Sequence, residues 1–204
     1  MDTAFLISAF VTLFVVIDPL GLAPLFAAMT HDESEARRRA IAIRAVVIGF
    51  AILCVFGIAG EAVLEFVGIS MPAFRISGGL LLFLTALEML FERRTKRRED
   101  QAEEDRPDPS IFPLATPLIA GPGAIASMIL LSGSPNATWA TTGTVIGVMA
   151  TVLLIVLLLF LGGGLLSRLL GKTGINVATR LLGMLLAALS VQFVIDGLRD
   201  LSLL

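Results

Sequence analysis

Six long apolar runs, separated by shorter polar segments, make up most of the chain. They cover residues 4–29, 40–60, 72–91, 111–131, 140–161 and 178–198. Each run is long enough for the helix of about 20 residues that crosses the hydrocarbon core of a bilayer. Runs such as Val152–Leu161 do not alternate between apolar and polar positions, as strands of a membrane β-barrel would. The pattern therefore predicts an all-α membrane protein with six transmembrane helices.

The composition agrees with a lipid environment. Of the 204 residues, 56% are hydrophobic and 16% are charged, and the mean hydropathy is +0.93. A soluble domain contains about 25% charged residues, so this chain has too little charge to cover a surface exposed to water. An ordinary soluble enzyme is therefore excluded. The net charge is −2, and no basic patch exists outside one loop. We expect membrane lipid, and no nucleic acid, among the partners.

The basic residues indicate how the helices are oriented. Thirteen of the fifteen Lys and Arg residues follow the first, third and fifth runs, and only Arg75 and Arg199 lie on the opposite side. Cytoplasmic loops of membrane proteins are enriched in Lys and Arg. We therefore predict a multi-pass membrane protein with the N-terminus and the C-terminus outside.

A charged segment divides the chain into two halves. Residues 92–110 carry charges of both signs together with Pro107 and Pro109, a composition typical of a solvated linker. We expect residues 92–110 to form a cytoplasmic linker between a first three-helix repeat, 1–91, and a second, 111–204. The two repeats together form one integrated domain.

The two halves share a pattern of residues. Arg75 and Thr85 in the first half correspond to Arg180 and Ser190 in the second, with Gly and Leu residues at matching positions between them and an offset of 105. Gly68-Ile69-Ser70 and Gly174-Ile175-Asn176 precede the two arginines, and Ser70 and Asn176 are expected to cap the helices that follow. Because each half has three spans, the second must cross the membrane in the opposite direction. The chain is therefore predicted to be an inverted 3+3 repeat, a common plan of secondary transporters.

Two of the predicted helices contain residues that break a helix near the middle of the span. The first run contains Asp18-Pro19-Leu20-Gly21, and the fourth contains Gly121-Pro122-Gly123-Ala124, at an offset of 103. Proline removes a backbone donor and clashes with the preceding turn. Pro19 and Pro122 suit the first position of a new half-helix, with Asp18 as the cap of the first. Helices 1 and 4 are therefore predicted to be broken.

A half-helix that begins inside the membrane directs unpaired N–H groups and a positive dipole end toward the centre of the protein. We expect the substrate-binding residues at the two breaks to be Asp18, Pro19, Leu20, Gly21, Gly121, Pro122, Gly123 and Ala124. The N–H groups suit the carboxylate of a small zwitterion. Its ammonium group is expected to reach Asp18 or the carbonyl groups freed near Ile17 and Ala120.

These stretches resemble the MarC family, also called the six-span neutral amino-acid transporter family and related to the LysE-type exporters. The resemblance rests on Phe14–Phe26 and Pro117–Ile125, which contain the two breaks, and on Arg75–Leu84 and Arg180–Asp196. It covers all six spans; the linker 92–110 departs from it. The resemblance implies an inner-membrane protein that moves small neutral amino acids such as glycine or alanine, most simply as an exporter.

Other polar residues within the spans are candidates for a transport path or a gate, because ionisable and polar groups are costly in lipid. They are Thr85, Arg75, Thr116, Arg180, Ser190 and Gln192. Snorkelling and hydrogen bonding between helices are the structural alternatives for the same side chains. Glu61 or Glu65 is the expected ion-pair partner if Arg75 belongs to a gate.

No catalytic motif, metal-ligand pattern or nucleotide-binding loop occurs in the sequence, so we expect no enzyme activity, no metal and no cofactor, with H⁺ or Na⁺ coupling left open. The function predicted is alternating-access transport of a small neutral amino acid around a site at the middle of the membrane. A channel-like ion conductor and a non-transporting membrane protein are the alternatives. Six short helices around a cavity are also compatible with a homo-oligomer.

Overall fold

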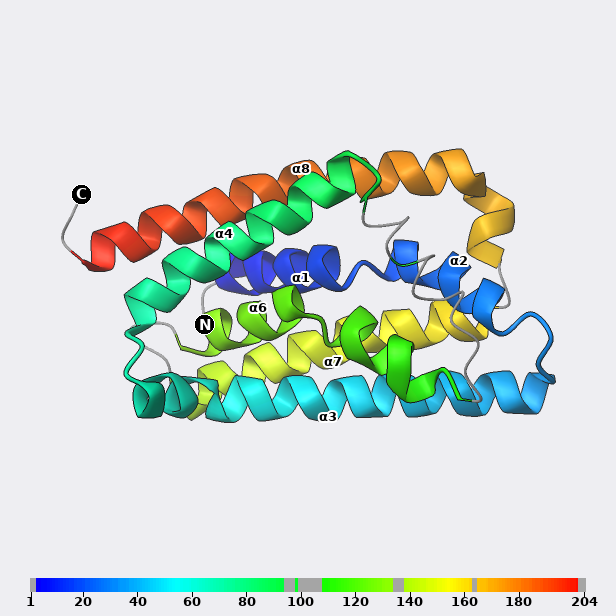
Figure 1. Ribbon diagram of the computed structural model, residues 1–204, viewed down its shortest axis with the longest axis horizontal. Helices are drawn as coiled ribbons and strands as arrows, with labels where there is room; N and C mark the ends of the chain where they lie inside the picture. The colour runs from blue at the N-terminus through cyan, green and yellow to red at the C-terminus, as the bar shows by residue number, and fades with distance from the viewer. Residues whose placement is uncertain (1–2, 94–97, 99–107, 134–137, 163–164, 202–204) are drawn as a thin grey trace.

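Figure 1 shows the computed structural model, which describes residues 3–93, 98, 108–133, 138–162 and 165–201. These residues form helices and their connections, with no strand among them. The elements are α1 (Thr3–Ile17), α2 (Pro19–Met29), α3 (Glu35–Val67), α4 (Met71–Leu90), η1 (Ser110–Ile119), α6 (Pro122–Ser132), α7 (Trp139–Leu161) and α8 (Leu165–Asp200).

Six spans can be formed from these helices. Five of them, counting α1 and α2 together, are long and apolar enough to cross a membrane, and the sixth is the pair η1 and α6, bent by 53°. The prediction of an all-α membrane protein with six spans is confirmed. The inverted repeat stays a prediction, with which the opposite directions of α1–α2 and η1–α6 in Figure 1 agree.

The two broken spans lie in the middle of the molecule, between two layers of longer helices. In Figure 1, α4 and α8 pack along one side, and α3 and α7 lie along the other. The core between them is formed by fully buried side chains such as Leu13, Leu22, Leu53 and Met149. Large apolar side chains such as Val55 are exposed on the outside, where a chain in a bilayer contacts lipid. The breaks are therefore surrounded by protein, as non-helical backbone within a membrane must be.

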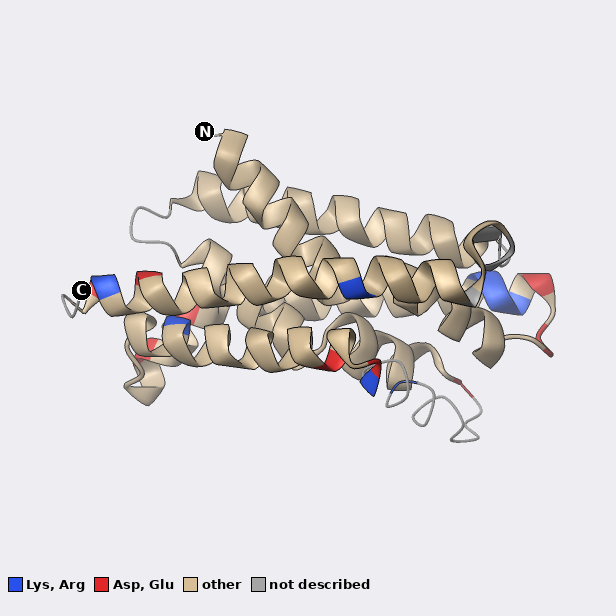
Figure 2. Ribbon diagram, turned by 90° about the horizontal axis from the view of Figure 1, so that it is seen from above, with Lys and Arg blue, Asp and Glu red and all other residues tan. Residues whose placement is uncertain are grey.

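Charged residues gather toward the two ends of this elongated bundle, with few between them (Figure 2). Arg37–Arg39 and Arg44 follow the connection between α2 and α3, and Arg199 lies at the opposite end, near the C-terminus. The charge distribution is therefore that of a chain whose middle section is in hydrocarbon.

The last helix differs from its prediction. We expected a loop between the fifth and sixth spans, with Arg180 near a helix start and Asn176 as a cap. Instead α8 begins at Leu165 and passes both residues, with one non-helical residue, Gly171 (φ 63°, ψ 174°). Because Gly171 has the backbone conformation that glycine adopts readily, it absorbs the bend and the helix resumes before Asn176. The side-chain amide of Asn176 contacts Glu92 instead, at 3.4 Å.

Candidate functional site

The break in the first span is built by Asp18. This residue has a left-handed conformation (φ 60°, ψ 65°), and its carboxylate Oδ1 accepts the backbone N–H of Gly21 at 3.1 Å. In an unbroken helix that N–H would be donated to the carbonyl oxygen of Ile17, four residues earlier. Asp18 therefore caps α2, as expected, and frees the last carbonyl group of α1. Its side chain is 2% exposed.

The counter-charge of Asp18 comes from the linker. Arg98 donates from Nη1 to Asp18 Oδ2 at 2.8 Å and from Nη2 to the Ile17 carbonyl oxygen at 3.4 Å, and its side chain is 6% exposed. The interpretation of 92–110 as a solvated linker is therefore wrong for Arg98. The physical reason is that a carboxylate buried in an apolar bundle is very costly unless a cation pairs with it. Residues 94–97 and 99–107 lie outside the described part of the chain.

The break in the second span has no side-chain cap. Gly121 precedes Pro122 in extended conformation (φ −81°, ψ 167°), and the first hydrogen bond of α6 runs from Ile125 N–H to Gly121 O at 3.0 Å. The N–H groups of Gly123 and Ala124 come before that bond, so the geometry of the helix gives them no acceptor within α6. This end of α6 directs two donors and the positive end of its dipole out of the helix.

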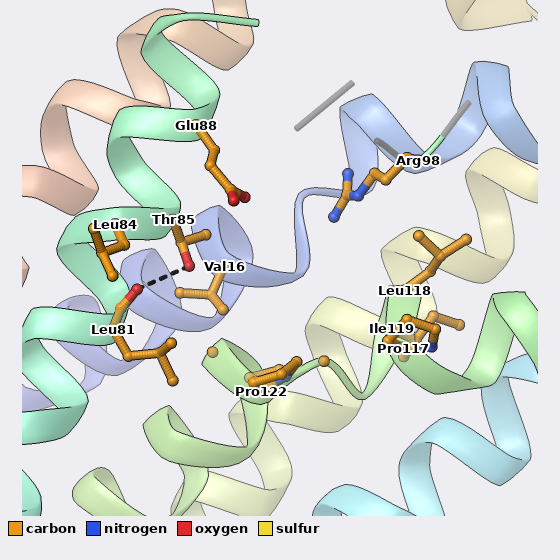
Figure 3. A pocket seen from close by; sticks show the side chains of 13 residues that line it. Val16, Leu81, Leu84, Thr85, Glu88, Arg98, Pro117, Leu118, Ile119 and Pro122 are labelled. Carbon is orange, nitrogen blue, oxygen red and sulfur yellow. Dashed lines mark hydrogen bonds between the residues drawn. The ribbon is translucent and has the colours of Figure 1, made fainter. Parts of the chain in front are cut away.

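A cavity of about 370 Å³ opens at this end of α6 (Figure 3). It lies between α1, α4, the η1–α6 break and Arg98. Its lining residues are Val16, Leu81, Leu84, Thr85, Glu88, Arg98, Pro117, Leu118, Ile119, Gly121, Pro122, Gly123 and Ala124. Figure 3 shows the side chains of Glu88 and Arg98 directed toward it from opposite sides. The cavity is therefore largely apolar, with one carboxylate, one guanidinium and a helix N-terminus.

The cavity contains one half of the predicted substrate site. Gly121, Pro122, Gly123 and Ala124 line it, whereas Asp18, Pro19, Leu20 and Gly21 are not among its described lining residues. Asp18 is buried, with 1% of the whole residue exposed. It is paired with Arg98, which itself lines the cavity. The expectation that both half-helix ends meet in one open site is therefore not met in this structure, because Arg98 lies at the first of them.

Among the candidates for a path or gate, only Thr85 lines the cavity, and its hydroxyl donates to the Leu81 carbonyl oxygen at 3.0 Å. Arg75 is buried at the other end of α4 and pairs with Asp200, so the expectation of Glu61 or Glu65 as its partner is wrong. Glu61 and Glu65 line a separate cavity between α3, α6 and α7.

The remaining candidates lie away from the cavity. Thr116 is exposed on η1, and Arg180 pairs with Glu92 at 2.7 Å. Ser190 is fully buried between α8 and α4, where its hydroxyl donates to the Ala187 carbonyl oxygen at 2.7 Å. Gln192 is exposed and donates to Asp196 at 2.8 Å. Within the described residues, no group of three or more His, Cys, Asp or Glu side chains is placed to hold a metal ion.

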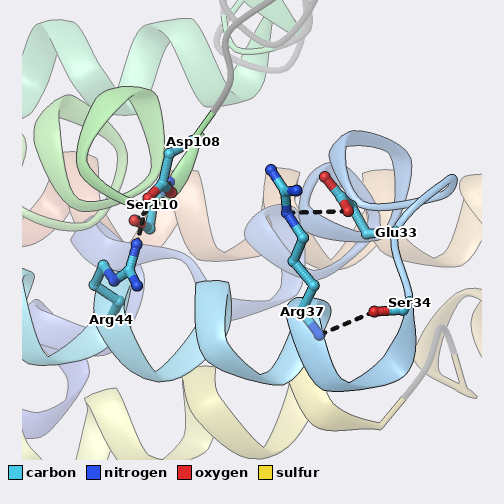
Figure 4. A network of polar contacts seen from close by, with 6 residues as sticks. All are labelled: Glu33, Ser34, Arg37, Arg44, Asp108 and Ser110. Carbon is cyan, nitrogen blue, oxygen red and sulfur yellow. Dashed lines mark hydrogen bonds and ion pairs between the residues drawn. The ribbon is translucent and has the colours of Figure 1, made fainter.

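A polar network holds the start of η1 against α3 (Figure 4). Asp108 Oδ1 accepts the side-chain hydroxyl of Ser110 at 2.6 Å and its backbone N–H at 3.0 Å, and Asp108 pairs with Arg44 through its other oxygen. The hydrogen bonds from Ser110, together with the charge of Arg44, hold the pKa of Asp108 below its ordinary value. This network fixes the position at which the chain enters the second broken span.

The sequence also matches known proteins. The family described as MarC family integral membrane protein matches residues 3–202. A UPF0056 membrane protein of Aquifex aeolicus is 38% identical over 205 residues, which cover 96% of this chain and 92% of the relative. The UPF0056 inner membrane protein YhgN of Escherichia coli is 35% identical, covering 95% and 96%. No solved structure matches the chain. This chain belongs to the MarC family of integral membrane proteins.

Proposed function

We propose that this protein is a secondary transporter of small neutral amino acids such as glycine or alanine, working most simply as an exporter. The observation that carries the proposal is the cavity of about 370 Å³ at the N-terminus of α6, between two spans that are broken near their middle. Its volume lies at the lower end of the range of small-molecule sites, about 300–1,000 Å³. A site of this kind suits a solute with few heavy atoms.

The chemistry around the cavity suits a zwitterion. A substrate carboxylate would be placed at the N–H groups of Gly123 and Ala124, which favour an anion. The ammonium group would be placed at the first break, where Asp18 and the Ile17 carbonyl oxygen accept hydrogen bonds. Apolar residues such as Val16 and Leu84 complete the walls and leave room for a short side chain.

In this proposal the breaks serve alternating access, as discontinuous helices do in many secondary transporters. The relative from Escherichia coli is named an inner membrane protein. In this proposal the present chain also lies in the inner membrane, with both termini outside. H⁺ or Na⁺ is the candidate coupling ion, and Asp18 is the group at which either would act.

Uptake into liposomes tests the proposal directly. The purified protein should take up radiolabelled glycine or alanine, and Asp18→Asn should reduce uptake to background. Because Asp18→Asn alone leaves a buried guanidinium unpaired, the double variant Asp18→Asn/Arg98→Gln separates loss of the site from loss of folding. Glu61→Gln, which changes a carboxylate at the separate cavity, is the matched control and should transport as the unmodified protein does.

The kinetics distinguish a carrier from a channel. A carrier gives saturable uptake and accelerated exchange when the vesicles are loaded with unlabelled substrate, whereas a channel gives a flux that does not saturate. Absence of uptake for every small neutral amino acid, with the protein folded in the vesicles, would contradict the proposed function.

A further inference from the structure

The guanidinium of Arg98 lies at the two acceptors that the first break provides. Asp18 Oδ1 is used by the N–H of Gly21, which leaves Oδ2 and the freed carbonyl oxygen of Ile17. Arg98 donates to both, at 2.8 and 3.4 Å. These are the acceptors expected for the ammonium group of a substrate, so a cation carried by the chain itself occupies that position in this structure.

The space for this cation is provided by Gly21. A Cβ atom at this position would lie 2.3 Å from Asp18 Oδ2 and 3.1 Å from Arg98 Nη1. The absence of a side chain therefore lets a planar guanidinium approach the carboxylate against the first turn of α2. On its other side Arg98 lines the cavity, while Asp18 does not. A solute that enters the cavity meets Arg98 before it meets Asp18.

We propose that Arg98 is a tethered cation in an organic-cation site formed by Asp18 and the Ile17 carbonyl oxygen, and that an incoming ammonium or guanidinium group displaces it. Removal of one partner from a buried ion pair leaves an uncompensated charge, which is strongly unfavourable. Arg98 therefore leaves Asp18 when another cation arrives to replace it. In the transport cycle this exchange couples substrate loading to release of Arg98; that part rests on the proposed function.

Guanidinium ion is the probe for the site, because it has the donor geometry of Arg98 without the tether. The thermal unfolding of the purified full-length protein is measured in detergent with 0–20 mM guanidinium chloride, and with NaCl at equal ionic strength. Arg98→Ala should gain a saturable rise in Tm of about 3 °C or more. The unmodified protein, Asp18→Asn/Arg98→Ala and the matched control Arg180→Ala should show no such rise. The proposal would be overturned if Tm also rose in Asp18→Asn/Arg98→Ala, or if it did not rise in Arg98→Ala.

Arg98→Gln is the second variant, since it keeps the length of the side chain and removes its charge. If Arg98→Ala and Arg98→Gln fold only in the presence of guanidinium, the site is exchangeable as proposed. If neither folds with or without guanidinium while Asp18→Asn/Arg98→Gln does, the ion pair is a fixed structural element and the proposal is wrong.

A transport measurement distinguishes exchange from direct binding of the substrate carboxylate by Arg98. If Arg98 competes with the substrate ammonium, Arg98→Gln lowers the apparent KM for uptake; if Arg98 binds the carboxylate, the KM rises and the proposal is overturned. If the unmodified protein transports no amino acid, the proposed function fails, while the guanidinium measurement still decides the assignment of Arg98.

Discussion

Gly21 is the residue on which the geometry of the first break depends most directly. Its N–H is donated to Asp18, and a Cβ atom there would lie 2.3 Å from Oδ2 and 2.9 Å from Cγ of the same carboxylate. We expect Gly21→Ala to displace Asp18 from Arg98 and to destabilise the fold by about 1–3 kcal/mol. Reversible unfolding in mixed detergent measures the change.

Gly143→Ala is the matched control for this prediction. Gly143 lies in α7, and an added Cβ meets no atom within 4 Å, so the substitution should be neutral or slightly stabilising because alanine favours a helix. Equal stability of Gly21→Ala and Gly143→Ala would show that the carboxylate has room to move.

At the residue scale, the sequence was informative about the broken backbone and uninformative about its counter-charge. Pro19 and Pro122 each follow a residue that suits the end of a helix, Asp18 or Gly121, and proline suits the first position of a new helix, so their positions predicted both breaks. Arg98 is one of several basic residues in a charged segment, and no local pattern distinguishes it. The signal that did exist was energetic, because a carboxylate in the middle of an apolar span requires a cation nearby.

At the scale of elements, α4 and α8 pack closely because glycines face the backbone of the partner helix. A Cβ at Gly79 would lie 2.8 Å from the Ser190 carbonyl oxygen and 3.2 Å from the backbone nitrogen of Val194. Small residues commonly allow such close approach between membrane helices. Because backbone atoms cannot turn away as a side chain can, we expect Gly79→Ala to separate the two helices.

The expected cost of Gly79→Ala is about 1–3 kcal/mol in the free energy of unfolding, the usual cost of overpacking. Gly147→Ala in α7 is the control, because no atom lies within 4 Å of an added Cβ there. Unfolding in mixed detergent measures both variants. An unchanged free energy for Gly79→Ala would contradict the close approach of α4 and α8.

The spans were predictable from hydrophobicity because their length and apolar character follow from the bilayer itself. The course of α8 was not, because Gly171 and Asn176 have the composition of a loop, whereas only Gly171 interrupts the helix and Asn176 lies within it. The position of Asn176 depends on packing and on its contact with Glu92, and such long-range contacts leave no periodic signal in the sequence.

At the scale of the whole molecule, the two ends of α3 are the positions at which the direction of insertion can be measured. This helix has 33 residues, about 50 Å, which exceeds the 40–45 Å of a bilayer with its headgroups. Its first turns follow the exposed connection that contains Asp32, and its last turn leads to Ile69, which is 41% exposed. These two positions must therefore lie on opposite sides of the membrane.

The basic residues after the first span predict that Asp32 faces the cytoplasm and that Ile69 and both termini face outward. In a background with Cys54→Ser, a membrane-impermeant maleimide should label Ile69→Cys in intact cells, and Asp32→Cys only after the membrane is opened. With six spans, both termini lie on the same side of the membrane as Ile69. A fluorescent protein fused to the C-terminus should therefore stay dark, and alkaline phosphatase fused at the same position should be active. The reverse labelling would mean that charge near the first loop does not determine the orientation.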